Sequence, residues 1–277
     1  MKWEPGHRSA DVEDRRGTPG RGGAGLKLGV GGTIVLALLS VVFGKDLAQG
    51  LGMGGPPQPA RPEDEVAFQF VSYVLDDNQA TWAKLFPEQF DTQYRKATMV
   101  VFSDSVDSAC GSADSAVGPF YCPGDDKVYI DLTFYRALKD KLGAPGDFAQ
   151  AYVIAHEIGH HIQNVLGTEA SVRKKQRGAS KEEKNNLSVR MELQADCYAG
   201  IWSKTTNDRK LLDAGDIEEA MNAASAIGDD RLQKAATGRV SPESWTHGSS
   251  AMRLRWFKRG FDSGQVKQCD TFRATEL

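Results

Sequence analysis

The sequence lacks several features that would assign it to common classes of protein. Its 277 residues carry a formal net charge of -3, and they contain neither an arginine-rich helix nor an RNA-binding signature. Nucleic acid is therefore not expected as a partner. The four cysteines include no C-x-x-C pair, which argues against a zinc knuckle and a thioredoxin-like motif. What remains is an ordinary globular composition, 40% hydrophobic and 26% charged, enough for one large domain or two small ones.

The first 62 residues differ in composition from the rest of the chain. Residues 1–27 have few large apolar side chains, which predicts a disordered tail. Residues 28–44 are uncharged and mostly apolar, and as a helix they would reach about 25 Å, slightly less than a hydrocarbon core of about 30 Å. A buried core helix and a cleaved signal peptide are alternatives, but uniform apolarity and the absence of an A-x-A site favour a retained transmembrane anchor. Residues 45–62 are rich in Gly and Pro and predict a linker.

The charges beside this apolar run predict its orientation. Six Lys and Arg residues precede the run, whereas only Lys45 follows it closely. Under the positive-inside rule, the sequence predicts a single-pass protein of the inner (cytoplasmic) membrane. Its N-terminus would be cytoplasmic, and a domain formed by residues 63–277 would be extracytoplasmic.

The patterns in residues 63–277 predict an α+β fold that is mainly helical. Apolar residues recur with helical spacing in 66–74 and again in 82–86, which predicts two helices separated by Asp76-Asp77-Asn78. Three segments are rich in Val, Phe, Tyr and Ile, residues typical of strands: 98–103, 118–122 and 127–132. A turn that contains Pro and Gly joins the last two, which predicts a small, partly antiparallel sheet. Longer helices are expected over 148–166, 186–204, 216–227 and 249–259. The charged stretch 171–186 is expected to be a solvated loop rather than a docking patch.

One expected helix carries the pattern H-E-x-x-H, formed by His156, Glu157 and His160. Residues i and i+4 share one face of a helix, so both imidazoles can reach a single metal ion. Glu157 lies about 100° around the helix axis from His156. It can therefore take a proton from metal-bound water rather than bind the metal itself. The metzincin extension is absent, because Gln163 and Leu166 stand where that subclass has Gly and His.

The next expected helix offers a third metal ligand. Glu192 and Asp196 are spaced i and i+4 on this helix and are flanked by small and apolar residues, which argues against a merely solvated face. Glu192 would complete a His2Glu site whose fourth position is left for water, as in catalytic zinc centres. Asp196, one turn further on, would accept a hydrogen bond from the free ring nitrogen of a zinc-bound histidine.

Four separated motifs resemble the bacterial putative neutral zinc metallopeptidase family: HEIGHHIQ, ELQADCYAG, GPFYCPGDDKVYID and THGSSAMRLRWFKRG. The resemblance covers roughly residues 64–272. It implies a zincin-like, gluzincin-like fold, Zn²⁺ as the cofactor, a protein or peptide as the substrate, and Glu192 and Asp196 in the roles given above. It also implies that the strand 118–122 binds the substrate backbone by edge addition.

His247 is a further candidate catalytic residue. The stretch THGSSAMR is similar to a His-Pro-containing stretch with a downstream Arg in membrane-associated prenyl-protease and stress-protease families, with Gly248 in place of Pro. That similarity implies that His247 donates a hydrogen bond to the oxyanion. A structural histidine that ties a loop to the core is an equal alternative, and His161, on another side of its helix, is expected to be structural.

Cysteine pairing and the overall function leave alternatives. Three disulfide pairings are possible, and an exported domain favours Cys110 with Cys122 and Cys197 with Cys269. The predicted function is hydrolysis of peptide bonds by a zinc-activated water, with Glu157 as the general base. One alternative is a catalytically silent, metal-binding scaffold of the envelope, against which the intact Glu157 argues. The other is a metal-dependent amidase in which Cys122 would be a ligand.

Overall fold

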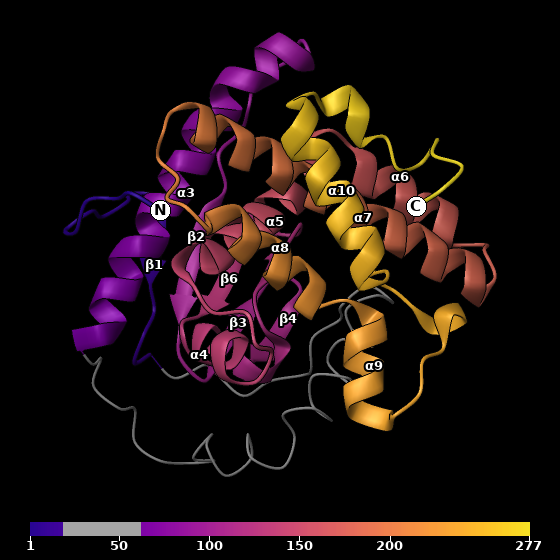
Figure 1. Cartoon of the computed structure of the whole chain (residues 1–277), viewed down its shortest axis with the longest axis horizontal. Helices are drawn as coiled ribbons and strands as arrows, with labels where there is room; N and C mark the ends of the chain where they lie inside the picture. The colour runs from indigo at the N-terminus through magenta and orange to yellow at the C-terminus, as the bar shows by residue number, and fades with distance from the viewer. Residues whose placement is uncertain (19–61) are drawn as a thin grey trace.

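The computed structural model describes residues 1–18 and 62–277, which form a mixed structure of helices and β-strands (Figure 1). Eight α-helices fall within the described part of the chain: α3 (Pro62–Gln89), α4 (Thr133–Asp140), α5 (Asp147–Val165), α6 (Thr168–Gln176), α7 (Lys181–Asp208), α8 (Asp216–Ala226), α9 (Asp229–Thr237) and α10 (Ser250–Ser263). The strands are β1 (Val12–Asp14), β2 (Thr98–Phe102), β3 (Ser105–Ser108), β4 (Gly111–Asp114), β5 (Phe120–Cys122) and β6 (Lys127–Asp131). Short 3₁₀ turns occupy Ser115–Val117, Pro242–Ser244 and Val266–Cys269.

The main sheet has the strand order β1-β2-β6-β5. β2 pairs in parallel with both β1 and β6, whereas β5 and β6 form an antiparallel pair across the turn at 123–126. The sequence predicted β2, β5 and β6 and the partly antiparallel character of the sheet. It did not predict β1 or the separate β3-β4 hairpin, because these short strands are rich in Asp, Glu, Ser and Gly rather than in aromatic and β-branched residues.

Helix α5 lies at the centre of the helical layer and packs against α3, α7 and α8, and α7 in turn packs along α10. In Figure 1, α3 lies on one side of the sheet region and α7 and α10 lie on the other. The core is continuous across these elements and contains large buried side chains, including Trp82, Trp202 and Trp256. A second apolar cluster lies between the β3-β4 hairpin and the sheet, around Phe102, Phe120 and Tyr129.

Residues 1–18 are ordered against this body, in contrast to the predicted disordered tail. Val12–Asp14 pair with Met99–Val101 of β2, and Trp3 contacts Phe70 edge to face. The amino group of Met1 lies 2.8 Å from an oxygen of Asp147 and 3.2 Å from one of Asp216. Backbone pairing and buried apolar contact hold the segment, although its composition is polar.

The predicted membrane topology was wrong. Because β1 and β2 belong to one sheet, residues 12–14 and the body of the protein lie in the same compartment. This arrangement contradicts a single-pass inner-membrane protein with a cytoplasmic N-terminus and an extracytoplasmic domain. Across residues 1–18 and 62–277, no helix has both the length and the apolar character needed to cross a bilayer. The expected transmembrane segment 28–44, and all but the last residue of the expected linker 45–62, lie outside the described residues.

Two helical predictions also need correction. The segment expected to contain two helices is one helix, α3, because the polar residues at the expected break find partners. Asn78 donates to the carbonyl of Val74, and Asp77 binds Trp202 and Arg209. The expected loop 171–186 consists largely of α6 and the start of α7. There Ser180 and Glu183 form a reciprocal capping box that begins α7 five residues earlier than the apolar pattern indicated.

Candidate metal centre

The structure brings three predicted ligands together. His156 and His160 lie on α5 and Glu192 lies on α7, and one ligand atom from each falls within 4.8 Å of the others. The Nε2 atom of His156 is 3.2 Å from Oε2 of Glu192, and Nε2 of His160 is 3.5 Å from Oε1. Both imidazoles therefore direct the same ring nitrogen toward one carboxylate.

A close approach of α5 and α7 makes this grouping possible. Gly159, inside the H-E-x-x-H turn, faces Ala195 of α7, and a Cβ atom at position 159 would lie 2.9 Å from the Cα of Ala195. Any larger residue would push the helices apart. Gly159 thus allows Glu192, one turn before Ala195, to reach the two histidines.

The other ring nitrogen of each histidine is held by a neighbouring side chain. Nδ1 of His156 is 2.8 Å from Oδ1 of Asp196, and Nδ1 of His160 is 2.9 Å from Oε1 of Gln163. Gln163 is itself oriented, because its amide nitrogen donates to the carbonyl of Met191 at 2.7 Å. In the neutral imidazole, an acceptor at Nδ1 keeps the proton there, so that each Nε2 can offer its lone pair to a metal ion. This is the tautomer that metal binding requires.

The contacts between Glu192 and the two imidazoles have the length expected between neighbouring ligands of one zinc ion. Bonds of about 2.0–2.1 Å in tetrahedral geometry place neighbouring ligand atoms about 3.3–3.4 Å apart. The Nε2 atoms of His156 and His160 lie 3.2 Å and 3.5 Å from the two different oxygens of Glu192. Two nitrogens and one carboxylate oxygen also match the donor chemistry of catalytic zinc sites, in which a fourth position stays open.

The electrostatics of the group favour a cation at its centre. Burial alone would lower the pKa of His160, but the charge and hydrogen bond of Glu192 outweigh it and raise that pKa to about 10. Burial would raise the pKa of Glu192, yet the neighbouring charges of His160 and His247 hold it well below its usual range. The carboxylate is therefore ionised, and positive charge beside it is stabilised.

Glu157 lies beside this group rather than within it. Its side chain is buried, and burial raises the pKa of its carboxyl group, with the charge of Glu192 acting in the same direction and the two imidazoles opposing. A carboxylate with a raised pKa is a better proton acceptor near neutral pH than a solvated one. The environment of Glu157 thus suits proton exchange near neutral pH.

Asp196 belongs to a buried network that the sequence only partly indicated. Besides His156, its carboxylate accepts from the hydroxyl of Tyr152 at 2.5 Å and from Arg253, whose Nε and Nη2 each lie at 2.8 Å. Burial would raise the pKa of Asp196, but the charges of Arg253 and His156 lower it to about 2. Asp196 is thus a fixed anion behind the first imidazole.

His247 lies on the loop before α10 and contacts a second buried carboxylate, Asp229. The His247 Nδ1 atom is 3.1 Å from Oδ1 of Asp229, whose Oδ2 accepts from the backbone N–H groups of Thr246, His247 and Gly248. Burial would raise the pKa of Asp229, but the charge of His247 and these hydrogen bonds lower it. The His247 ring is 13% exposed, and it lies close enough to Glu192 to influence that carboxylate.

Four residues of this arrangement received no role from the sequence: Tyr152, Gln163, Asp229 and Arg253. Arg253 lies inside the motif THGSSAMR, which was a usable signal, and Gln163 falls one turn after His160. Asp229 is 18 residues before His247, so no local pattern could connect the two. His161 is structural as expected, since it is fully buried and lies 2.6 Å from the carbonyl of Arg95.

Both expected disulfides are present. Cys110 bonds to Cys122, and Cys197 bonds to Cys269. Cys122 is therefore not free to ligate a metal, which removes the basis for the amidase alternative.

Two imidazoles from α5 and a carboxylate from α7 form a donor set of the kind found in mononuclear zinc sites. The chain belongs to the family described as "Putative neutral zinc metallopeptidase", whose model matches residues 1–272. Zn²⁺ is accordingly its cofactor.

Bacterial relatives support this assignment. An Escherichia coli (strain K12) protein described as "Uncharacterized protein YpfJ" is 50% identical over 285 residues, covering 98% of this chain and 99% of that protein. "Uncharacterized protein Rv2575" of Mycobacterium tuberculosis (strain ATCC 25618 / H37Rv) is 43% identical over 209 residues, covering 72% of this chain and 68% of the relative. No solved structure matches the chain.

Proposed function

We propose that this protein is a zinc-dependent peptidase in which His156, His160 and Glu192 hold the metal and Glu157 is the general base. The observation that carries the proposal is the convergence of the two Nε2 atoms on the two oxygens of Glu192, with both Nδ1 atoms already occupied by acceptors. When bound, zinc would polarise the scissile carbonyl and lower the pKa of water at the open position.

The residues around the centre divide the proton and charge transfers between them. Glu157 would accept a proton from the attacking water and return it to the leaving nitrogen. His247, held through Nδ1 by Asp229, would present its other nitrogen to the negative charge that develops on the carbonyl oxygen. Asp196 and Gln163 would keep the two imidazoles in the orientation that binds metal.

The experiment that tests this proposal compares the full-length protein with its Glu157→Gln variant. Purified protein of each kind is analysed for zinc and then incubated with a proteome-derived peptide library. We expect one zinc per chain in both, and peptide cleavage by the wild type only. Equal cleavage by the variant would remove Glu157 from the mechanism.

A catalytically silent scaffold is the remaining alternative, and the same experiment decides it. A zinc-loaded wild type that cleaves no peptide in the library would favour the scaffold. The buried Glu157 argues against that result, because a structural site has no use for a buried base and usually closes its fourth position.

A further inference from the structure

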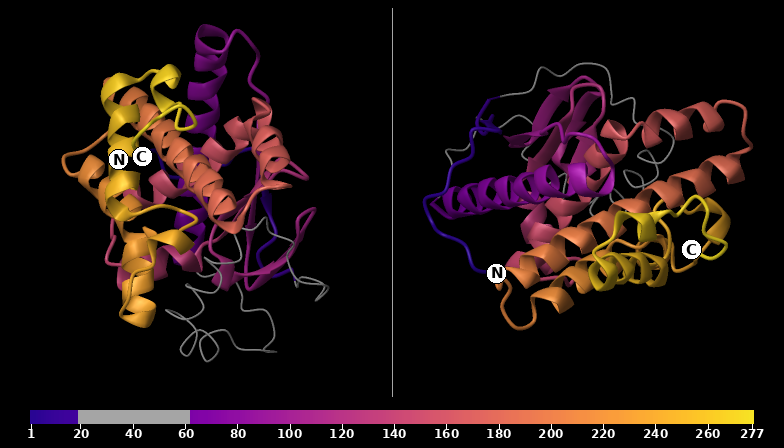
Figure 2. Two further views of the ribbon diagram at one scale, coloured as in Figure 1. Left: turned by 90° about the vertical axis from the view of Figure 1, so that its right-hand side faces the viewer. Right: turned by 90° about the horizontal axis from the view of Figure 1, so that it is seen from above.

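A hairpin formed by α6 and the first turns of α7 carries an excess of positive charge. Residues 168–190 contain seven Lys and Arg and three Glu, a net charge of +4 in a chain whose net charge is -3. The hairpin lies at the end of the molecule away from α3 (Figures 1 and 2). Five of its cations are exposed, and we call the four that form no ion pair within the described residues the basic cluster: Lys174, Lys175, Arg177 and Lys181.

The basic cluster has no acidic partner within the described parts of the chain. Among the hairpin cations, Arg173 does have an acidic partner, because it forms an ion pair with Glu169 along α6. Glu183 is engaged as the cap of α7 and accepts from the backbone N–H of Ser180 at 2.8 Å. Four exposed cations therefore remain available to an anionic partner.

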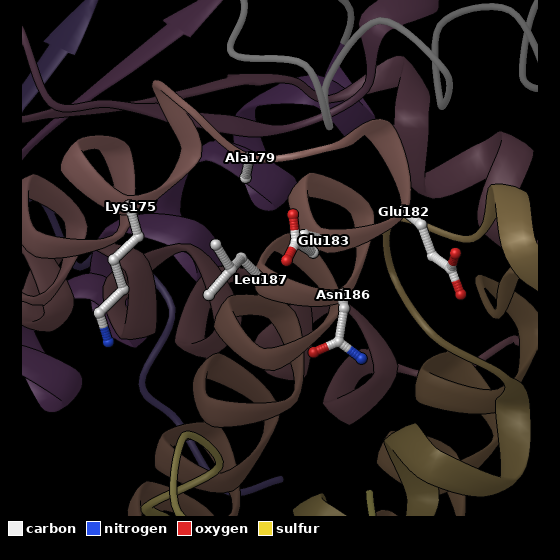
Figure 3. A pocket seen from close by; sticks show the side chains of 6 residues that line it. All are labelled: Lys175, Ala179, Glu182, Glu183, Asn186 and Leu187. Carbon is white, nitrogen blue, oxygen red and sulfur yellow. The ribbon is translucent and has the colours of Figure 1, made fainter.

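A hollow lies beside the basic cluster, between the end of α6 and the start of α7. Its volume is about 470 Å³, and none of its lining residues belongs to the metal centre. Lys175 lies on one side, Glu182 on the other and Leu187 between them (Figure 3). Its lining includes Lys175 but also Glu182 and Glu183, so an acidic chain would meet the basic cluster beside the hollow rather than inside it.

The hairpin is connected rigidly to the candidate metal centre. Helix α7 runs without interruption from Lys181 to Glu192, and Asn185 on this stretch donates to the carbonyl of Glu243, near His247. Eleven residues of helix correspond to about 16 Å. An extended peptide crosses that distance in about five residues.

We propose that the basic cluster is a docking surface for an acidic segment of the protein substrate, about five or more residues from the scissile bond. This inference rests on the proposed peptidase function and adds a substrate class to it. The hairpin suits a peptide better than a nucleic acid, because residues 167–190 contain no aromatic side chain on which bases could stack. It is also poorly suited to a membrane surface, because its Val172 and Val189 are buried and it presents no large exposed apolar side chain.

The test uses peptides that share a cleavable core taken from the library digest. One peptide carries five Glu residues placed six positions from the scissile bond, and the other carries five Gln at the same positions. The docking variant is the full-length triple substitution Lys174→Gln, Lys175→Gln and Lys181→Gln. The matched control removes three exposed lysines elsewhere: Lys139→Gln, Lys234→Gln and Lys267→Gln.

We expect the wild type and the control to prefer the Glu peptide about tenfold in kcat/KM at low salt, mainly through KM. The preference should shrink as salt approaches about 1 M, where the screening length is about 3 Å. The docking variant should treat both peptides alike while cleaving the Gln peptide at the wild-type rate. Equal use of both peptides by the wild type, or an unchanged preference in the docking variant, would overturn the proposal.

A binding measurement separates this proposal from the peptidase function. Fluorescence anisotropy of the labelled Glu and Gln peptides on the Glu157→Gln protein reports docking without turnover. The docking surface is supported even if the wild type cleaves no peptide, provided that Glu157→Gln binds the Glu peptide about tenfold more tightly than the Gln peptide. This preference must disappear when the three docking substitutions are added to Glu157→Gln. Stronger binding through the same lysines to vesicles containing anionic phospholipid, or to single-stranded RNA, would refute an acidic peptide as the ligand.

Discussion

Arg253 holds both carboxylate oxygens of Asp196, with its Nε 2.8 Å from Oδ2 and its Nη2 2.8 Å from Oδ1. Both side chains are almost completely inaccessible to solvent, and Arg253 comes from α10 whereas Asp196 comes from α7. The pair therefore couples the packing of these two helices to the orientation of His156, which Asp196 also contacts. A C-terminal helix thus helps to determine how a histidine of α5 faces the metal centre.

Replacing Arg253 should be severely destabilising. In Arg253→Gln, Asp196 keeps a buried negative charge without its main counterion, and breaking a buried pair in this way costs about 3–5 kcal/mol. The free energy of unfolding, measured by urea denaturation followed by circular dichroism, should fall by that amount. Arg136→Gln is the control, because Arg136 is exposed and should change stability by less than about 1 kcal/mol. A loss of similar size in both variants would show that the buried pair has no special importance.

Removing a proposed metal ligand and removing the carboxylate behind one should differ in their effect on zinc binding. Glu192→Ala should lose zinc, because only two donors remain. Asp196→Asn should retain the ligands but bind zinc about 10–100-fold more weakly, since it weakens the acceptor that orients His156. Zinc content after dialysis against a graded series of chelator concentrations measures both effects. Full occupancy in Glu192→Ala would show that another side chain completes the centre.

Asp229 should make stability depend on acidity. Its pKa in the folded protein is lowered, so the unfolded chain takes up a proton at a higher pH than the folded protein does. The stabilisation that ionised Asp229 gives to the folded protein is therefore complete above about pH 3.9, the pKa of Asp in the unfolded chain. It is lost as the pH falls through the lower pKa of Asp229 in the folded protein. The difference in unfolding free energy between wild type and Asp229→Asn should be constant between about pH 5 and pH 6 and should shrink below about pH 4. A difference that grows on acidification would contradict the assigned direction.

The same substitution should alter the role of His247 without removing zinc. Asp229→Asn keeps the size of the side chain but weakens the hold on Nδ1 of His247. We expect normal zinc content, and a lower kcat for peptide cleavage with little change in KM. A structural role limited to the loop would instead lower stability and leave kcat unchanged in the folded fraction.

The two disulfides should contribute unequally to stability. Cys197 and Cys269 are 72 residues apart, whereas Cys110 and Cys122 are 12 apart. In the chain-entropy account, a longer closed loop stabilises more, at about 4 kcal/mol for the first bond and about 3 kcal/mol for the second. Urea denaturation of the two double-alanine variants tests the order. The opposite order would show that local packing of the β3-β4 hairpin outweighs loop length.

The sequence predicted the parts of the site that depend on local spacing. His156, Glu157 and His160 follow from one helical turn, and Glu192 and Asp196 follow from another, so the residues alone indicated which face each would occupy. Asp229 and Arg253 could not be placed in this way. Their contacts with His247 and Asp196 join segments that are 18 and 57 residues apart, and only the folded chain shows them.

The errors in the predicted fold have a similar origin. The polar run at 76–78 interrupts the apolar pattern and so indicated a helix break, but Arg209, at the end of α7, supplies a counterion for Asp77. The start of α7 lacks an apolar stripe, and the capping box of Ser180 and Glu183 marks where the helix begins. Residues 1–18 have too few apolar side chains to fold by themselves, and they become ordered by adding to a sheet that already exists.

The addition of β1 to β2 has a practical consequence for any shortened form of the protein. A fragment beginning at residue 63 would leave one border of β2 with a row of unsatisfied peptide groups. Such borders recruit strands from other molecules. The fragment should therefore self-associate or precipitate, and preparations intended for kinetics should keep the first eighteen residues.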